Sequence, residues 1–211
     1  MKVIFGIGKV KRPFKKAVLV IGVFDGLHLG HQQLIRQAVR RAKAIGGEAV
    51  VLTFWPHPIH VLHPEIHLPL IISLPHRLKI LAALGIDACV VVRFTKSFST
   101  MTPHRFIQQY LVRGIRPQEV FVGDDFRFGQ DRTGTLDLFK QEGQTSGFKV
   151  NPVKSVKGGL AKISSTRIRE QISDGQLKEA QRWLGRPVSL MGRGVKGEAR
   201  GKTLGYPTAN I

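Results

Sequence analysis

The sequence is poor in cysteine and in long apolar runs, and each shortage excludes a class of protein. Cys89 is the single cysteine among 211 residues, so no intramolecular disulfide can form, and we expect a reducing, cytoplasmic compartment. No apolar run reaches the roughly 20 residues that a membrane-spanning helix needs, so we expect no membrane partner. The basic segment 1–20 lacks the apolar stretch and small-residue cleavage site of a signal peptide.

Acidic residues are also scarce. They number 14 against 33 lysines and arginines, which gives a formal net charge of +19. Such an excess attracts polyanions, so the chain binds either nucleic acid or small phosphorylated ligands. The basic residues are scattered along the sequence and form no block, which favours the small ligands. Apolar residues make up 42% of the chain, which is typical of a folded protein.

Short apolar runs alternate with amphipathic segments, and this pattern predicts an α/β fold with a parallel sheet. We expect strands at 17–23, 48–54, 88–94, 119–122 and 148–153. We expect helices at 31–45, 76–84, 103–112, 165–172 and 176–184, and a long loop at 56–75. Ligands of such sheets bind at the carboxyl ends of the strands, where the chain order reverses. The loop after the first predicted strand is therefore the first candidate for chemistry.

The composition changes after Gly185, where a glycine-rich stretch without a helical pattern follows. We therefore place a domain boundary there, with one domain at 1–185 and the beginning of a second, different domain at 186–211. The second segment is too short to close a hydrophobic core by itself.

The segment 22–31, Gly-Val-Phe-Asp-Gly-Leu-His-Leu-Gly-His, carries the clearest chemical signal. It joins a predicted buried strand to a helix, where Gly30 lets the backbone approach a phosphate and the helix start offers free N–H groups. His28 and His31 are suited to donate hydrogen bonds to a phosphoryl group in a transition state. The alternative is a turn whose histidines are incidental.

This segment resembles the HxGH nucleotidyltransferase superfamily, and more narrowly the prokaryotic bifunctional riboflavin kinase/FMN adenylyltransferases, also called FAD synthetases. Further matching segments follow in order at 53–58, 98–103, 122–129 and 163–169. The resemblance implies a Rossmann-like nucleotidyltransferase domain that transfers AMP from ATP to FMN, with Mg²⁺ as cofactor. Two alternatives remain: another HxGH nucleotidyltransferase with a different acceptor, and a basic nucleic-acid-binding module.

The resemblance also implies residue roles. The catalytic residues would be His28, His31 and Arg169. The residues that bind ATP would be Gly22, Phe24, Asp25, Gly30, Ser164, Ser165 and Thr166. The residues that bind the flavin would be His57, Pro58, Asp124, Asp125, Phe126 and Phe128. No metal ligand is assigned.

The segment 164–166 also has a physical interpretation of its own. Its hydroxyls precede a predicted helix, so they cap that helix, hold phosphates together with Arg167 or Arg169, or do both. The histidines of segment 57–67 are separated by prolines and lack the spacing of a metal site, so we interpret them as loop residues.

The segment 124–128 follows a predicted strand and so lies at the carboxyl edge of the sheet. Asp124 and Asp125 hold Mg²⁺ through water, contact ligand hydroxyls, or cap a polar loop. Phe126 and Phe128 offer a face to a ring system or pack in the core. The sequence alone leaves these alternatives open.

The end of the chain resembles the start of a β-barrel riboflavin kinase domain. The matching residues, which the resemblance implies bind ATP and Mg²⁺, are Gly205, Pro207, Thr208 and Asn210. The family places its kinase carboxylate further along than Ile211, so we do not expect kinase activity from these 211 residues. A longer parent protein would also take riboflavin as a substrate.

Overall fold

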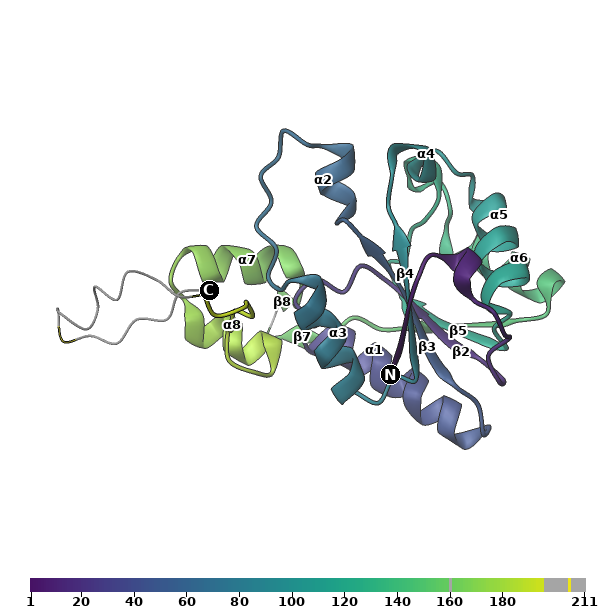
Figure 1. Ribbon diagram of the computed structural model, residues 1–211, viewed down its shortest axis with the longest axis horizontal. Helices are drawn as coiled ribbons and strands as arrows, with labels where there is room; N and C mark the ends of the chain where they lie inside the picture. Colours follow the sequence, from purple (N-terminus) through teal and green to yellow (C-terminus); the bar gives the residue numbers. More distant parts are fainter. Residues whose placement is uncertain (160, 196–204, 206–211) are drawn as a thin grey trace.

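The computed structural model describes residues 1–159, 161–195 and 205, which fold into an α/β architecture around one sheet (Figure 1). The sheet has six parallel strands in the order β1-β4-β3-β2-β5-β6. The strands are β1 (Lys2–Phe5), β2 (Val18–Ile21), β3 (Ala49–Trp55), β4 (Ala88–Arg93), β5 (Glu119–Gly123) and β6 (Lys149–Val153). The predicted fold class is confirmed.

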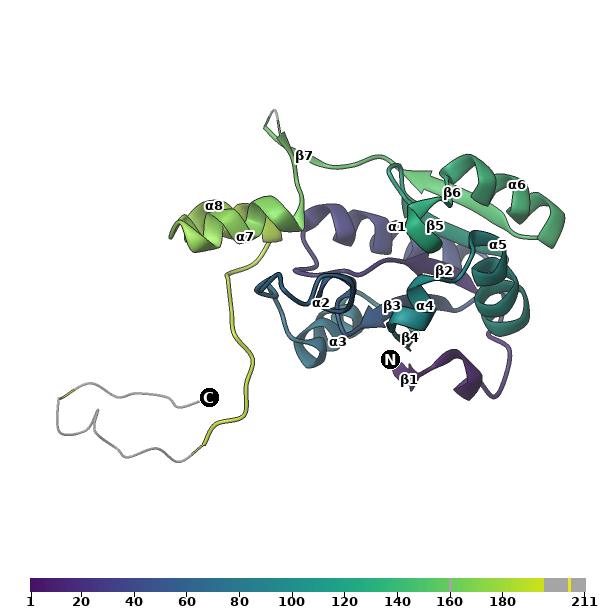
Figure 2. The same ribbon diagram turned by 90° about the horizontal axis from the view of Figure 1, so that it is seen from above.

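Helices cover both faces of this sheet (Figure 2). The α-helices are α1 (Leu29–Ala44), α2 (Pro58–Leu62), α3 (Leu74–Ala83), α4 (Lys96–Ser99), α5 (Pro103–Phe106), α6 (Leu136–Ser146), α7 (Ser165–Ser173) and α8 (Leu177–Leu184). A π-helical segment η2 (Ile107–Ile115) continues α5, and short 3₁₀ turns lie at η1 (Ile7–Lys9) and η3 (Gln130–Arg132). A small antiparallel hairpin is formed by β7 (Lys157–Gly158) and β8 (Ala161–Lys162).

Two hydrophobic cores form because the strands are buried on both faces. Val18 and Val20 of β2 point into a core completed by α1, α3, α7 and α8. Leu19 and Ile21, which alternate with them, point into a core completed by η2 and α6. Cys89 of β4 is fully buried, and burial raises the pKa of its thiol to about 12.

The order of the strands reverses at β2. From β2 the chain proceeds outward through β3 to β4, and later crosses back to β5 on the other side of β2. The carboxyl ends of β2 and β5 therefore diverge into loops that leave the sheet in opposite directions. In a parallel sheet this switch point is the position that binds ligands.

Several expected boundaries were wrong. Strand β1, the first in the chain, was not expected. It has only four residues, of which Ile4 alone is buried, and it forms because it pairs with β4 at the sheet edge. The helix α6 was missed because it buries only Phe139 and Gly143, too few for a clear apolar period. The expected loop 56–75 contains α2, and the expected helix 103–112 continues through η2. Helix α1 begins before His31, because His28 caps it.

Candidate functional site

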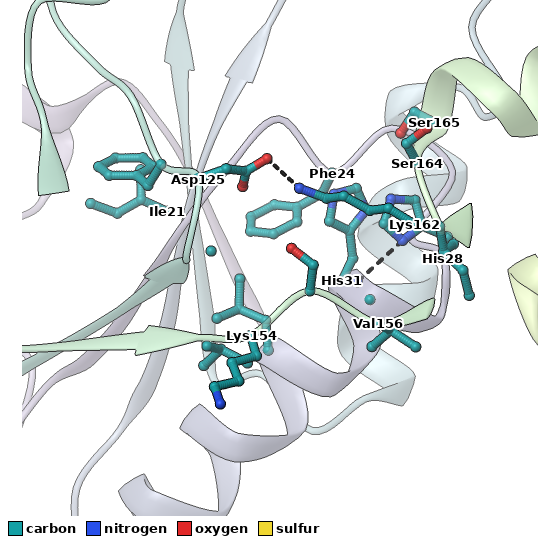
Figure 3. Close-up of a pocket in the computed structure, with 18 residues that line it drawn as sticks. Ile21, Phe24, His28, His31, Asp125, Lys154, Val156, Lys162, Ser164 and Ser165 are labelled. Carbon is teal, nitrogen blue, oxygen red and sulfur yellow. Dashed lines mark hydrogen bonds and ion pairs between the residues drawn. The ribbon is translucent and has the colours of Figure 1, made fainter. Parts of the chain in front are cut away.

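A cavity of about 300 Å³ lies at the carboxyl ends of β2, β5 and β6 (Figure 3). It is bordered by the β2–α1 loop, the loop after β5, the loop after β6 and the start of α7. Its lining residues from the sequence prediction are Gly22, Phe24, His28, Gly30, His31, Asp125, Phe126, Ser164 and Ser165. Residues from three regions that are far apart in the sequence, 21–34, 123–126 and 153–165, thus meet at the switch point.

The β2–α1 loop adopts a strained backbone. Phe24 and Leu27 have positive φ angles of 57° and 43°, and Gly26 between them has 79°. Non-glycine residues in this region cost about 1–3 kcal/mol each and persist where the surroundings hold them. Both side chains are fully buried, which fixes the loop. A Cβ at Gly22 would lie 2.7 Å from the Phe24 ring, so only glycine fits there.

His28 and His31 form a stacked pair at the start of α1. Their ring centroids are 3.7 Å apart with an interplanar angle of 16°. His28 caps the helix, because its Nδ1 accepts a hydrogen bond from the backbone N–H of His31 at 3.3 Å. A Cβ at Gly30 would lie 3.2 Å from the His28 ring, so the glycine between the histidines makes room for the stack.

The helix cap fixes the proton position on His28. The pKa of His28 is lowered to about 4, mainly by burial and also by Lys162 and Arg186, while Asp25 opposes this effect. The ring is therefore neutral at pH 7, and since Nδ1 accepts a hydrogen bond, the proton lies on Nε2. Burial also lowers the pKa of His31, and the adjacent His28 adds to this effect. Both residues act as neutral imidazoles, which donate a hydrogen bond without a net charge.

His31 has an open hydrogen-bonding position. Its Nδ1 is buried and has no partner among the described residues. The ring also meets the edge of Phe24, with centroids 5.3 Å apart, so its orientation is set by packing on two sides. Because buried polar atoms are normally hydrogen-bonded, this nitrogen is available to a ligand that enters the cavity.

The neutral histidines predict a pH-dependent stability. The pKa of His28 is about 4 in the folded chain and 6.5 in the unfolded one, so the unfolded chain binds the proton more tightly between these values. Lowering the pH from about 7 to about 5 should therefore reduce the free energy of unfolding by about 2 kcal/mol through this residue alone. Urea denaturation at several pH values measures the slope.

The matched variant is His28→Asn, which keeps a polar side chain but removes the titration. Its slope between about pH 5 and pH 7 should be smaller than that of the unmodified chain, because only the other buried histidines still contribute. Burial lowers the pKa of His57 to about 4 as well, so a residual slope of the same sign is expected. Equal slopes in the two proteins would contradict the neutral state of His28.

Asp25 and Arg169 form an ion pair behind the cavity. Arg169 Nη2 lies 2.8 Å from Asp25 Oδ2, and the side chains are 12% and 2% exposed. The Asp25 carboxylate also accepts hydrogen bonds from the backbone of Ile71 and Ile72, and Arg169 Nε donates to the Pro69 carbonyl. Neither Asp25 nor Arg169 borders the cavity; through these contacts the pair anchors α7 and the segment 69–72 against the β2–α1 loop.

The start of α7 lies beside the histidines. Ser164 caps the helix by accepting a hydrogen bond from the backbone of Arg167 at 3.4 Å, and Ser165 Oγ donates to the Asp25 carbonyl at 2.8 Å. Both serines border the cavity, whereas Thr166 is exposed and does not. The capping interpretation and the phosphate interpretation of this segment are thus compatible in space.

The acidic pair after β5 is divided between two partners. Asp124 accepts hydrogen bonds from the Ser155 hydroxyl and backbone, which lowers the pKa of the carboxyl. Asp125 borders the cavity and pairs with Lys162 of β8 (Figure 3). The pair joins the loop after β5 to the hairpin across the cavity.

The two phenylalanines of this loop have different surroundings. Their rings stack at 5.3 Å, but Phe128 is buried against Phe106 and Phe139 in the core. Phe126 is partly buried and borders the cavity. Only Phe126 therefore has a face available to a ligand in this cavity.

The predicted flavin residues of the β3–α2 turn lie elsewhere. His57 caps α2 by accepting a hydrogen bond from the Ile59 backbone at 3.2 Å, and Pro58 occupies the first helical turn. Neither borders the main cavity. His60 instead contacts the Leu68 carbonyl. Among the described residues, no group of three or more His, Cys, Asp or Glu side chains has a geometry that could hold a metal.

Sequence reasoning missed several cavity residues. Lys154 and Ser155 follow the carboxyl end of β6. Lys162 is the last residue of β8 and lies shortly before Ser164 and Ser165 in the sequence. The rule that ligands bind at carboxyl ends of strands would have pointed to Lys154 and Ser155. Lys162 reaches the cavity through the hairpin, which no pattern in the sequence indicated. Of the kinase-like motif, Gly205 is an exposed turn residue, and Pro207, Thr208 and Asn210 lie outside the described residues.

Comparison with known proteins agrees with this geometry. A family model for FAD synthetase matches residues 10–167, and one for riboflavin kinase matches residues 184–211. The bifunctional riboflavin kinase/FMN adenylyltransferase of Escherichia coli (strain K12) is 35% identical over 212 residues, which cover 100% of this chain and 68% of that protein. The enzyme of the same name from Listeria monocytogenes is 40% identical over 197 residues, 92% of this chain and 62% of that protein.

A solved structure is also similar. A protein from Streptococcus pneumoniae described as a macrolide-efflux protein superposes with a TM-score of 0.85 at 34% identity, covering 100% of this chain and 68% of that one. In the part of our chain that the structure describes, every helix is too short or too polar to cross a membrane. Because the FAD synthetase model spans most of the chain, and a relative that is 35% identical matches the whole of this chain, the chain belongs to the FAD synthetase family.

Proposed function

We propose that this chain transfers AMP from ATP to FMN, forming FAD and releasing pyrophosphate. The observation that carries the proposal is the meeting of two neutral, stacked histidines with the serine-capped start of α7 in one cavity at the sheet's switch point. Hydrogen-bond donors and a helix start placed together form a site for phosphates. Family membership and the names of the relatives supply the two substrates.

In the proposed reaction an oxygen of the FMN phosphate attacks the α-phosphorus of ATP. A new phosphorus–oxygen bond forms to FMN, the bond between the α-phosphorus and the bridging oxygen breaks, and pyrophosphate leaves with the electron pair. The FMN phosphate is already ionised at neutral pH, so no protein base is required. His28 and His31 donate hydrogen bonds to the phosphate oxygens as charge develops, and Ser164 and Ser165 hold the triphosphate.

Mg²⁺ enters as the Mg·ATP complex in this proposal, where it neutralises phosphate charge. Magnesium is commonly held by substrate phosphates plus one or two carboxylates. Among the described residues that border the cavity, Asp125 carries the one carboxylate, so it is the residue that fits this role. Lys162, its present partner, would then be free to bind a phosphate.

The flavin side of the site is proposed from the family resemblance and from the loop after β5. Phe126 borders the cavity and offers a ring face to the isoalloxazine, while Asp124 and Phe128 would shape the loop from behind. His57 and Pro58 would contact the flavin only where it extends beyond this cavity, toward α2. Arg169 would act by holding Asp25, and with it the β2–α1 loop, in place.

The segment 186–211 is proposed as the beginning of the riboflavin kinase domain, following an adenylyltransferase domain at 1–185. In a longer parent protein, this second domain would phosphorylate riboflavin and supply FMN to the first. A cytoplasmic location, where these soluble substrates occur, is part of the same proposal.

The test is pyrophosphate release from Mg·ATP with one acceptor at a time: FMN, nicotinamide mononucleotide or phosphopantetheine. We expect release and FAD formation with FMN only. ATP with a methylene group between the α- and β-phosphorus should give no product, whereas the β,γ-methylene analogue should still react. Release with another acceptor would identify a different nucleotidyltransferase. Steeply salt-dependent nucleic-acid binding without any release would instead support a nucleic-acid-binding module.

A further inference from the structure

Arg186 lies just past the end of α8 and turns back toward the β2–α1 loop. Its Nη2 donates a hydrogen bond to the Gly26 carbonyl at 2.6 Å. Its Nη1 lies 3.4 Å from the carbonyls of both Leu27 and Leu184. The guanidinium group, which is always charged, thus connects three carbonyls from two segments that are far apart in the sequence.

Gln32 of α1 makes a second connection between the same segments. Its buried Nε2 donates to the Leu27 carbonyl at 2.9 Å and to the Leu184 carbonyl at 2.8 Å. Arg186 and Gln32 therefore share two acceptors. Gly185, the residue between Leu184 and Arg186, has a φ of 67° that ends α8 and redirects the chain toward the loop.

Two of the three carbonyls that Arg186 contacts, those of Gly26 and Leu27, belong to the β2–α1 loop. Gly26 and Leu27 both have positive φ angles, and His28 follows directly. A loop that would relax when released needs fixed contacts to keep its conformation. The positions of the His28 and His31 rings depend on this turn, because His28 begins the helix on which His31 lies.

Sequence comparison places Arg186 in a different unit from the loop it contacts. The FAD synthetase match ends at residue 167, whereas the riboflavin kinase match begins at residue 184. A residue of the second match therefore contacts a loop that belongs to the first. No motif in the sequence indicated this contact.

We propose that Arg186 is a positioning residue for adenylyl transfer, which holds the Gly26–Leu27 turn so that the two imidazoles meet the α-phosphate in line. The proposal rests on the proposed function. Arg186 does not border the cavity, so we assign it no direct contact with the phosphates. Through the histidines, Arg186 acts on the transfer step, in which charge develops on the phosphate oxygens. It does not act on the initial binding of ATP.

The test compares Arg186→Ala and Arg186→Lys with Arg182→Ala in the 211-residue chain. Arg182 is the matched control, because it lies on α8 with its side chain 73% exposed and pairs only with Glu179 in the described structure. We expect Arg186→Ala to lower kcat for FAD formation by about 10- to 100-fold, since small misplacements of catalytic groups have effects of this size. KM for ATP should change by less than about threefold. Arg186→Lys should recover part of kcat, and Arg182→Ala should match the unmodified chain.

A double-variant cycle with Gln32→Ala tests the shared acceptors. Because both side chains donate to the same two carbonyls, their effects on kcat should be non-additive. Unchanged kcat in Arg186→Ala, or a loss that appears in KM alone, would overturn the proposal. Should Arg186→Ala fail to fold, the same criteria apply to Arg186→Lys, which keeps the charge.

The histidine NMR signals separate this proposal from the proposed function. If the unmodified chain releases no pyrophosphate with FMN, the proposed function fails regardless of Arg186. The His28 and His31 imidazole resonances should still shift in Arg186→Ala and Arg186→Lys, and stay in place in Arg182→Ala. Resonances that stay in place in every variant would show that Arg186 does not position the rings.

Discussion

Alanine at His28 or at His31 is expected to lower the turnover number of FAD formation by about 10²- to 10³-fold. Each imidazole is neutral, oriented by the stack, and borders the cavity, so each is a preorganised donor whose loss is not replaced by water. The measurement is the initial rate of pyrophosphate release at saturating Mg·ATP and FMN. KM for ATP should change much less, because these donors act most strongly in the transition state.

The matched control is His104→Ala. His104 lies on α5 with its side chain 67% exposed, pairs with Glu142, and does not border the cavity. Its rate should equal that of the unmodified chain. The double variant of His28 and His31 should be little slower than the slower single variant, since stacked residues act as a unit. Near-normal turnover in both single variants would refute their catalytic role.

Arg169→Ala is expected to reduce the free energy of unfolding by about 3 kcal/mol. The substitution leaves the Asp25 carboxylate buried without its cationic partner, held only by backbone N–H groups of residues 71 and 72. It also removes the hydrogen bond from Arg169 Nε to the Pro69 carbonyl. Urea denaturation measures the change in the free energy of unfolding. Equal m-values would show that the variant and the unmodified chain expose a similar surface area when they unfold.

Arg167→Ala is the matched control for this variant. Arg167 lies two residues earlier on α7 and is exposed, so its loss should change the stability by no more than about 0.5 kcal/mol. Asp25→Asn combined with Arg169→Ala should restore part of the stability, because it removes the buried charge that Arg169 neutralised. If Arg169→Ala were as stable as the control and only KM for ATP rose, Arg169 would be a phosphate ligand, not an anchor.

Much of the fold was predictable because it is encoded in local patterns. The apolar run 17–23 and the segment 22–31 predicted a buried strand, a loop and a helix, and β2, the strained turn and α1 follow that order. Alternation of strands and helices predicted a parallel sheet, and its general geometry predicted where the cavity lies. Strand β1 and helix α6 were not predicted, because few of their own residues are buried and their conformation depends on the elements packed against them.

The candidate site was predictable in its residue types but not in its contacts. The serines of α7 were expected near phosphates, and they do border the cavity with the histidines. The same reasoning treated Arg169 as a phosphate partner, whereas in the structure its guanidinium contacts Asp25, 144 positions earlier. Lys162 reaches the cavity only through the β7–β8 hairpin.

The sequence by itself determined the α/β class, the position of the HxGH loop and the chemistry available there, because these depend on side-chain type and on short-range periodicity. Only the tertiary structure decided that Asp25 pairs with Arg169 of α7, that Phe128 is a core residue, and that Arg186 reaches Gly26 across 160 positions. Such contacts depend on how whole elements pack, and packing is set by the combined shape of distant segments. A local pattern carries no information about which distant carbonyl a side chain will meet.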